Sequence, residues 1–269
     1  MCGDDGRAPA QALPARLERF AHGVKPGGDG VEGRQVIGRA GHREATALLL
    51  AECRAKLVLG ARRADRLEAL AARVTEVGGE AAWARTDVTR RADLADLVAL
   101  AVERFGKLDV VINNAGIGPI SPLDDLRVEE WDTMIDVNLK GVLYGIAAAL
   151  PVFRRQGFGH FVNTASTAAH RIVPNQSVYA GTKSAVRVIS EGLRQEAGDK
   201  LRVTVISPGF TRTGFAEDVT NPGVKAQIAE SKDRFAMPPD AIARAIVFAI
   251  EQPADIDVGE VIVRPTAQA

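Results

Sequence analysis

The sequence has few cysteines, no net charge and no long uninterrupted apolar run. Cys2 and Cys53 are the only cysteines among 269 residues. Neither is placed for a disulfide, which suits a reducing compartment. Lysine plus arginine and aspartate plus glutamate number 34 each, so no net charge favours nucleic acid or an anionic membrane as a partner. A small-molecule partner is the natural expectation.

Metal-binding and membrane-spanning patterns are also missing from the sequence. The four histidines have neither i, i+4 spacing nor CxxC-type neighbours, so we predict no metal site. The apolar stretch 142–153 is interrupted by Tyr144, Gly145 and Pro151, whereas a membrane span needs about 18 apolar residues. The first residues lack the basic start and apolar core of a signal peptide. We therefore predict a cytoplasmic protein with no membrane association.

The chain divides into two regions of different composition. Residues 1–33 are rich in Gly, Pro, Ala and Arg and have little apolar periodicity, which predicts a disordered N-terminal extension. From about residue 35 onward, short apolar runs alternate with longer segments of helical period. A chain of this length fits one α/β domain, which we place at residues 34–269.

Strands and helices alternate regularly along this domain. The apolar runs predict strands at 56–59, 81–85, 109–112, 160–163, 202–206 and 260–263, with a weaker first strand at 36–37. Helical periodicity predicts helices at 44–53, 64–77, 91–105, 128–155, 177–197 and 239–251. The alternation predicts a doubly wound, mostly parallel seven-stranded sheet with helices on both faces. Ligands bind such sheets at the carboxyl ends of the strands.

Small and hydroxylated residues follow three of these strands. The run Asn113-Asn114-Ala115-Gly116 would let a ligand approach the backbone closely, or it could form an ordinary turn. Ser166 lies outside any GxSxG setting, so hydrogen bonding or capping is expected of it rather than nucleophilic attack. The break at Pro208-Gly209 could be a plain turn, or it could close over one face of a bound ring.

Tyr179 and Lys183 stand four residues apart in a helical segment and so share one face. A phenol ionises near pH 10 unaided, whereas a general acid or base works best near ambient pH. A neighbouring ammonium favours the phenolate and lowers the tyrosine pKa. On its own, such a pair is also common on solvated helices.

In this order, the residues resemble the short-chain dehydrogenase/reductase family from about Glu44 to the C-terminus. The resemblance rests on Asn113-Asn114-Ala115-Gly116, on Asn138 in Val-Asn-Leu-Lys-Gly, on Ser166, on Tyr179 with Lys183, and on Pro208-Gly209 with Thr213. It implies a single-domain Rossmann fold that moves a hydride between a nicotinamide cofactor and a carbonyl or alcohol carbon of a small substrate. It also implies a homotetramer or homodimer assembled through the helices that hold Asn138 and Tyr179.

The resemblance further implies residue roles. Tyr179 would exchange a proton with the substrate oxygen, and Ser166 would hold and polarise the same oxygen. Lys183 would lower the tyrosine pKa and bind the nicotinamide ribose, while Asn138 would steady a water in a proton relay. The implied cofactor contacts are Gly38, Gly41, Arg62, Arg63, Asp87, Asn114, Ala115, Gly116, Tyr179, Lys183, Pro208, Gly209, Phe210 and Thr213. The closing Val263-Arg264-Pro265-Thr266 resembles bacterial members that act on small 3-hydroxy acids or aldehydes.

The end of the second predicted strand bears on the choice of cofactor. Arg62 and Arg63 stand where an acidic residue would accept hydrogen bonds from a ribose 2′-hydroxyl. Arginine instead complements a 2′-phosphate, which favours NADP(H) over NAD(H). The alternative is that both arginines are solvated charges at the start of a helix.

The first turn of the domain departs from the family pattern of three glycines. Counting back from Glu44, Gly41 fits the second position and Arg43 stands at the third, while Gly38 fits the first only if one residue is missing between it and Gly41. Arg54 likewise replaces the glycine usual before the next strand. Two interpretations remain open. Either the chain is a cofactor-deficient relative that acts as a binding or regulatory protein, or residues up to about 54 carry a local sequence error in an intact enzyme.

Overall fold

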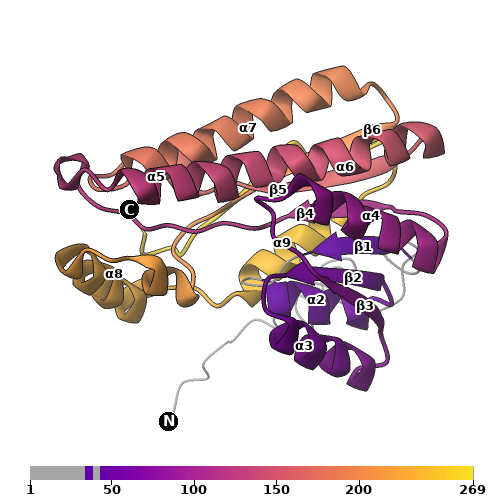
Figure 1. Ribbon diagram of the computed structural model, residues 1–269, viewed down its shortest axis with the longest axis horizontal. Coiled ribbons are helices and arrows are strands. Elements are labelled where there is room, and N and C mark those ends of the chain that lie inside the picture. The colour runs from indigo at the N-terminus through magenta and orange to yellow at the C-terminus, as the bar shows by residue number, and fades with distance from the viewer. Residues whose placement is uncertain (1–33, 39–42, 269) are drawn as a thin grey trace, which may run out of the picture.

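A parallel sheet of seven strands forms the centre of the protein, in the order β3-β2-β1-β4-β5-β6-β7 (Figure 1). The computed structural model describes residues 34–38 and 43–268. Its strands are β1 (Gln35–Gly38), β2 (Lys56–Ala61), β3 (Glu80–Arg85), β4 (Val110–Asn113), β5 (Gly159–Thr164), β6 (Leu201–Pro208) and β7 (Glu260–Val263). All six neighbouring pairs are parallel, so the predicted fold class is confirmed.

The helices lie close to their predicted positions, with two exceptions. They are α2 (Arg43–Glu52), α3 (Ala64–Glu76), α4 (Arg91–Phe105), α5 (Val128–Met134), α6 (Gly141–Gln156), α7 (Ser177–Ala197), α8 (Pro222–Phe235) and α9 (Asp240–Glu251). The single helix expected at 128–155 is wrong in detail, because a π-helical turn, Ile135–Lys140, separates α5 from α6. The sequence analysis did not predict α8.

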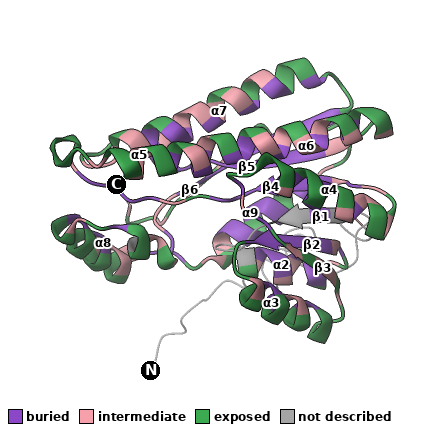
Figure 2. Cartoon of the chain, in the orientation of Figure 1, coloured by how far each residue is buried: buried purple, intermediate pink, exposed green. Residues whose placement is uncertain are grey.

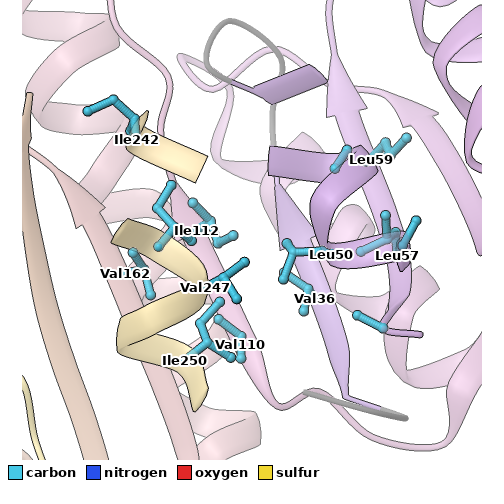
Figure 3. Close-up of a cluster of buried hydrophobic side chains, with 14 of the residues drawn as sticks. Val36, Leu50, Leu57, Leu59, Val110, Ile112, Val162, Ile242, Val247 and Ile250 are labelled. Carbon is cyan, nitrogen blue, oxygen red and sulfur yellow. The ribbon is translucent and has the colours of Figure 1, made fainter. Parts of the chain in front are cut away.

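Alternating side chains of the strands fill two apolar layers. Leu57 and Leu59 of β2 belong to a cluster with residues of α2, α3 and α9, whereas Val58 points into a second cluster with α4, α6 and α7. Figure 3 shows part of the first cluster, which includes Val36 of β1 and Leu50 of α2. In Figure 2, α9 is largely buried, while α3 and α8 turn exposed faces outward. Helices therefore cover both faces of the sheet.

The longest helical stretch, Val128–Gln156, is apolar enough to cross a membrane by length and composition, with a mean hydropathy of 1.3. In the fold, Val142, Ala149 and Phe153 of this stretch are buried. The Phe153 ring meets Phe161 of β5 edge to face, with 4.9 Å between the ring centroids. The stretch thus packs as one of the helices that cover the sheet.

Helix α2 ends on an arginine in the left-handed backbone conformation. Arg54 has a φ of 60°. Its N–H donates to the carbonyl of Ala51, and the next N–H, of Ala55, reaches back to Leu50 at 3.0 Å. The corresponding residues after α3, α4, α6 and α7 are all glycines with positive φ: Gly78, Gly106, Gly157 and Gly198. The backbone after α2 therefore keeps a conformation that favours glycine, as the resemblance implied.

Part of the predicted nucleotide turn lies outside the described residues. Gly38 ends β1 and is in register with Leu59 of β2. Gly41 and the extension at 1–33 are not among the residues that the structure describes.

Candidate active site

The residues predicted to act on a substrate meet where β4, β5 and β6 end. Ser166 follows β5 and begins a 3-10 turn, Thr167–Ala169, where its hydroxyl oxygen accepts a hydrogen bond from the N–H of Ala168 at 3.1 Å. Helix α7 brings Tyr179 to the same edge, and the Tyr179 hydroxyl is hydrogen-bonded to Ser166. One turn further along α7, Lys183 is buried and donates from Nζ to the Thr164 carbonyl at 2.9 Å. These three side chains form one cluster.

Burial dominates the ionisation of this cluster. Loss of solvent raises the pKa of the Tyr179 phenol, and the hydrogen bond with Ser166 offsets part of that rise. Burial lowers the pKa of Lys183 to about 8. The causes of the Tyr179 shift are burial and the hydrogen bond with Ser166, so the role of Lys183 in lowering the tyrosine pKa stays a prediction. The Lys183 ammonium lies 5.9 Å from the centre of the Tyr179 ring and is directed at the Thr164 carbonyl.

Asn138 ties the loop after β4 to α7. It lies in the π-helical turn and is fully buried. Its side chain accepts from the N–H of Ile117 at 2.8 Å and donates to the Ile117 carbonyl at 2.9 Å. The Asn138 amide nitrogen also lies 3.2 Å from the hydroxyl of Thr182, which the sequence analysis did not single out. Single π turns commonly occur at functional sites. This one directs the Asn138 side-chain amide toward the loop after β4.

Gly116 packs directly against the cluster. A Cβ added to Gly116 would lie 3.2 Å from Lys183 Nζ and 3.5 Å from Asn138 Oδ1. The first of these contacts is tighter than most side chains accept. The small residue in the Asn-Ala-Gly run thus lets the backbone approach the ammonium closely.

An apolar group covers the outer side of Tyr179. The Phe215 ring meets the Tyr179 ring edge to face with 5.4 Å between centroids. The same ring lies over Gly118, where an added Cβ would come within 2.1 Å of it. Tyr179 and Phe215 pack against the buried residues Ile120, Val219, Val224 and Ile228. The last two belong to α8, so this helix forms one wall beside the phenol.

A second group of predicted residues lines a pocket between β4, α4 and α6. Asn114 and Ala115 lie there with Val88, Leu94 and Gly141. Asn114 Oδ1 is buried and has no hydrogen-bond partner. An acceptor left unpaired at the carboxyl edge of the sheet suits a ligand that offers a hydrogen-bond donor. These residues fit the dinucleotide that the sequence implies.

Asp87 stands at the entrance of α4, after β3. Its carboxylate accepts from the Thr89 N–H at 3.0 Å and from the Thr89 hydroxyl at 2.9 Å. Its own N–H donates to Asp93 at 2.9 Å. This short network fixes the turn that borders the pocket.

Arginines gather at the carboxyl end of β2 and β3. Arg62 and Arg63 are exposed where β2 ends. Arg85, which ends β3, is also exposed, and its Nε donates to the Arg62 carbonyl at 3.3 Å. Arg85 was not among the predicted site residues, although the parallel register of two predicted strands indicates this neighbourhood. Guanidinium groups at this edge suit a phosphate ligand.

The loop after β6 begins beside the end of β7, with which β6 pairs in parallel. The Gly209 N–H donates to the Val263 carbonyl at 2.6 Å, and the Phe210 N–H donates to Gln268 Oε1 at 2.7 Å. The hydroxyl of Thr213 lies 3.4 Å from the Thr211 carbonyl. Pro208 ends β6 itself, and Gly209, Phe210 and Thr213 follow it in the same loop.

Metal-ligating side chains do not cluster within the described part of the chain, where no three of His, Cys, Asp or Glu gather. Burial raises the pKa of the free Cys53 thiol to about 11, with the Glu251 and Glu52 charges adding to the rise. A thiol with so high a pKa is a poor nucleophile at neutral pH.

Comparisons with known proteins agree with this geometry. A family model described as short chain dehydrogenase matches residues 36–222. An "uncharacterized oxidoreductase" of Staphylococcus saprophyticus is 46% identical over 233 residues, which cover 86% of this chain and 94% of that protein. An alcohol dehydrogenase of the archaeon Thermococcus sibiricus, complexed with 5-hydroxy-NADP, superposes with a TM-score of 0.79 at 32% identity, covering 88% of this chain and 99% of the other. A serine dehydrogenase complexed with NADP+ superposes with a TM-score of 0.80 at 28% identity, covering 87% and 96%.

Proposed function

The chain belongs to the short-chain dehydrogenase family of oxidoreductases, and from this premise we propose that it transfers a hydride between NADP(H) and a carbonyl or alcohol group of a small substrate, with Tyr179 as the general acid and base. The observation that carries the proposal is the cluster of Tyr179, Ser166 and Lys183 at the carboxyl edge of the sheet. The bound cofactor would supply the hydride, and the chain's own residues handle the proton.

The proton step follows from the geometry of Tyr179 and Ser166. Because its pKa is raised, the phenol is protonated at neutral pH and so carries the proton that a carbonyl oxygen would receive. The Ser166 hydroxyl, already hydrogen-bonded to Tyr179, would hold the same oxygen in reach. In reduction the carbonyl carbon gains the hydride, the oxygen gains the phenol proton, and an alcohol results. Oxidation is the reverse, with the phenolate as base.

Lys183 and Asn138 would assist the proton step without exchanging a proton with the substrate. As the phenol loses its proton, a protonated Lys183 stabilises the negative charge that develops on Tyr179. Asn138 holds the loop that carries Gly116 against Lys183, which fixes where the ribose of a cofactor would lie. Because Gly116 has no Cβ, the Lys183 ammonium has room to donate to a ribose hydroxyl.

Three exposed arginines support NADP(H) as the cofactor. Arg62 and Arg63 follow β2, and Arg85 lies beside them at the end of β3. A 2′-phosphate would accept charge-assisted hydrogen bonds from this group, whereas a 2′-hydroxyl would bring no negative charge to the three cations. The unpaired Asn114 Oδ1 would accept a hydrogen bond from the dinucleotide.

The alternative function, a cofactor-deficient binding or regulatory protein, is less well supported. Its basis is Arg43 in place of a glycine near the nucleotide turn. A binding protein has no need to keep a lysine buried beside a tyrosine and a serine, since burying an ammonium costs free energy unless function repays it. Asn138 and Gly116 are likewise arranged toward that lysine.

The substitution Tyr179→Phe tests the proposed role of the phenol. We expect NADPH affinity to stay within about threefold of the wild type, because the ring and its packing remain, while turnover falls by about a thousandfold or more. The measurement is kcat on a panel of ketones and aldehydes, with NADPH binding followed by fluorescence. Near-normal turnover in the Tyr179→Phe variant would show that the proton comes from another group.

A homo-oligomer and a cytoplasmic location remain part of the proposal. Apolar side chains are exposed on the helices that the resemblance assigns to an interface, among them Val188 of α7 and Leu143 of α6. Such exposure favours contact with a second copy of the chain. Light scattering that gave the mass of a monomer would contradict the oligomer.

A further inference from the structure

Glu260, the first residue of β7, contacts three separate elements of the candidate active site. Its Oε1 accepts from the Ser207 hydroxyl at 2.8 Å and lies 2.8 Å from His170 Nε2. Arg187 of α7 donates from Nε to Oε1 at 3.0 Å and from Nη2 to Oε2 at 3.0 Å. His170 Nε2 and the Ser207 hydroxyl are themselves 3.2 Å apart. The carboxylate is therefore the centre of a closed polar network.

Each partner of Glu260 belongs to a segment that carries a proposed site residue. His170 directly follows the 3-10 turn that begins at Ser166. Ser207 precedes the Pro208-Gly209 loop and is fully buried. Arg187 lies one turn after Lys183 on α7. One carboxylate thus holds the loop after β5, the loop after β6 and the helix of the tyrosine in a fixed relation.

Gln268, near the C-terminus, makes a second bridge between the same two loops. Its Oε1 accepts from the Phe210 N–H at 2.7 Å, and its Nε2 lies 3.3 Å from the Thr167 hydroxyl. The Gln268 oxygen also lies against Gly209, where an added Cβ would come within 2.4 Å of it. The side chain therefore closes over the backbone of the loop after β6.

These contacts are strong enough to fix the loops. The Arg187–Glu260 pair is bidentate and about one quarter exposed on the carboxylate side, so water screens it less than a surface pair. Hydrogen bonds to charged groups are stronger than neutral ones, and this carboxylate accepts them from a guanidinium and a buried hydroxyl. Together they favour the ordered conformation of the two loops over conformations that lack these contacts.

We propose that Glu260 and Gln268 are positioning residues, which we name the C-terminal brace, and that the brace holds the loops after β5 and β6 in the spacing needed to bind the nicotinamide end of the cofactor beside Ser166. The proposal rests on the proposed function for its catalytic consequence. Its structural part, the ordering of the two loops by the brace, does not. The brace touches neither substrate nor the reacting atoms and acts through Ser207, His170 and Phe210.

Hydrogen exchange on the full-length protein tests the structural part. In Glu260→Ala we expect amide exchange within residues 166–171 and 207–213 to accelerate at least about tenfold, while exchange in β4 and α9 stays within about twofold. In Gln268→Ala the Phe210 amide loses its acceptor, so its exchange should accelerate with little change elsewhere. Exchange that is unchanged in both variants, or that rises equally over the whole chain, would overturn the proposal.

Two further variants make the test specific. Glu260→Gln keeps the shape and one acceptor but removes the charge, so it should lie between the wild type and Glu260→Ala; it also replaces the alanine variant if that one does not fold. Glu191→Gln is the matched control, because Glu191 pairs with Arg194 on the same helix α7 but is exposed. We expect the control to leave exchange in both loops unchanged. If it accelerated them as Glu260→Gln does, the brace would have no special role.

Cofactor binding and kinetics test the catalytic part. We expect Glu260→Ala to raise the NADPH dissociation constant about tenfold and to lower kcat at saturating NADPH, and Glu260→Gln to restore part of both. If the wild type bound no nicotinamide cofactor, the proposed function would fail, while the exchange results would still decide the structural part. If the wild type bound and turned over normally and Glu260→Ala matched it in both constants, the positioning role would be refuted and the proposed function would stand.

Discussion

At the scale of single residues, Lys183 carries its ammonium into the interior and donates to the Thr164 carbonyl at 2.9 Å. Burial lowers its pKa to about 8, within the range where enzymes are assayed. The pKa of Tyr179 shifts in the opposite direction, because burial raises it despite the hydrogen bond with Ser166. Over the neutral range the pair is therefore a neutral phenol and a charged ammonium, which suits donation of a proton to a carbonyl oxygen.

The lowered lysine pKa predicts a pH dependence for carbonyl reduction. Below about pH 8 Lys183 is charged and stabilises the developing phenolate, so kcat/KM should be level there. Above it, neutral lysine loses this effect, and kcat/KM should fall by up to about tenfold per pH unit. The measurement is kcat/KM between about pH 6 and 10, which reports on the free enzyme.

The matched control for this profile is Lys183→Arg. A guanidinium stays charged through the whole assay range, so the fall above about pH 8 should disappear even if the rate is lower throughout. A wild-type profile that stayed level to about pH 10 would show that Lys183 does not control the proton step.

At the scale of elements, the end of α2 carries a cost that the other helix ends avoid. Arg54 has a φ of 60°, whereas glycines occupy the equivalent place after four other helices. A side chain in the left-handed region costs about 1 to 2 kcal/mol. We expect Arg54→Gly to raise the free energy of unfolding by about 1 kcal/mol, measured by urea denaturation.

Gly78, after α3, provides the reciprocal variant. It has a φ of 80° and no neighbouring atom within 4 Å of an added Cβ, so Gly78→Ala tests backbone strain without a clash. It should lower stability by about the amount that Arg54→Gly gains. If Arg54→Gly were neutral or destabilising, the contacts of the Arg54 side chain would outweigh its strain.

The elements and their order could be predicted from sequence because buried parallel strands leave compact apolar runs. The π turn at Ile135–Lys140 could not, since one extra residue barely alters helical periodicity over 29 residues. Helix α8 was missed although its signal is present. Asn221 caps it, accepting from the Val224 N–H at 3.1 Å, and Pro222 occupies its first turn.

Some residues of the candidate site could likewise be predicted from the sequence, and others could not. Ser166, Tyr179 and Lys183 could be identified because their order and spacing along the chain resemble the family pattern. Glu260 and Gln268 could not, because their partners Ser207 and Thr167 are 53 and 101 residues away along the chain. Contacts across such distances depend on the packing of β6 and β7, which no local pattern records. The raised tyrosine pKa likewise follows from burial under Phe215, not from sequence spacing.

At the scale of the whole molecule, the proposed catalytic residues occur in a chain whose sequence departs from the family pattern at the first turn. The pocket around Asn114, the arginines at the end of β2 and the Tyr179 cluster lie along the carboxyl edge of one sheet. In the proposed function, each would bind a different part of an extended dinucleotide. Only the pyrophosphate segment depends on the turn where the sequence has Gly41 and Arg43 in place of the family's glycine pattern. Binding of the cofactor is therefore the point on which the whole account depends.

The most direct measurement is a fluorescence titration of the full-length, folded protein with NADPH, and with NADH in parallel. The account predicts saturable binding of NADPH with a dissociation constant below about 100 μM, equivalent to about 5.5 kcal/mol, and weaker binding of NADH because the arginines lack their phosphate. Absence of binding by either nucleotide, in protein shown to be folded by circular dichroism, would contradict it.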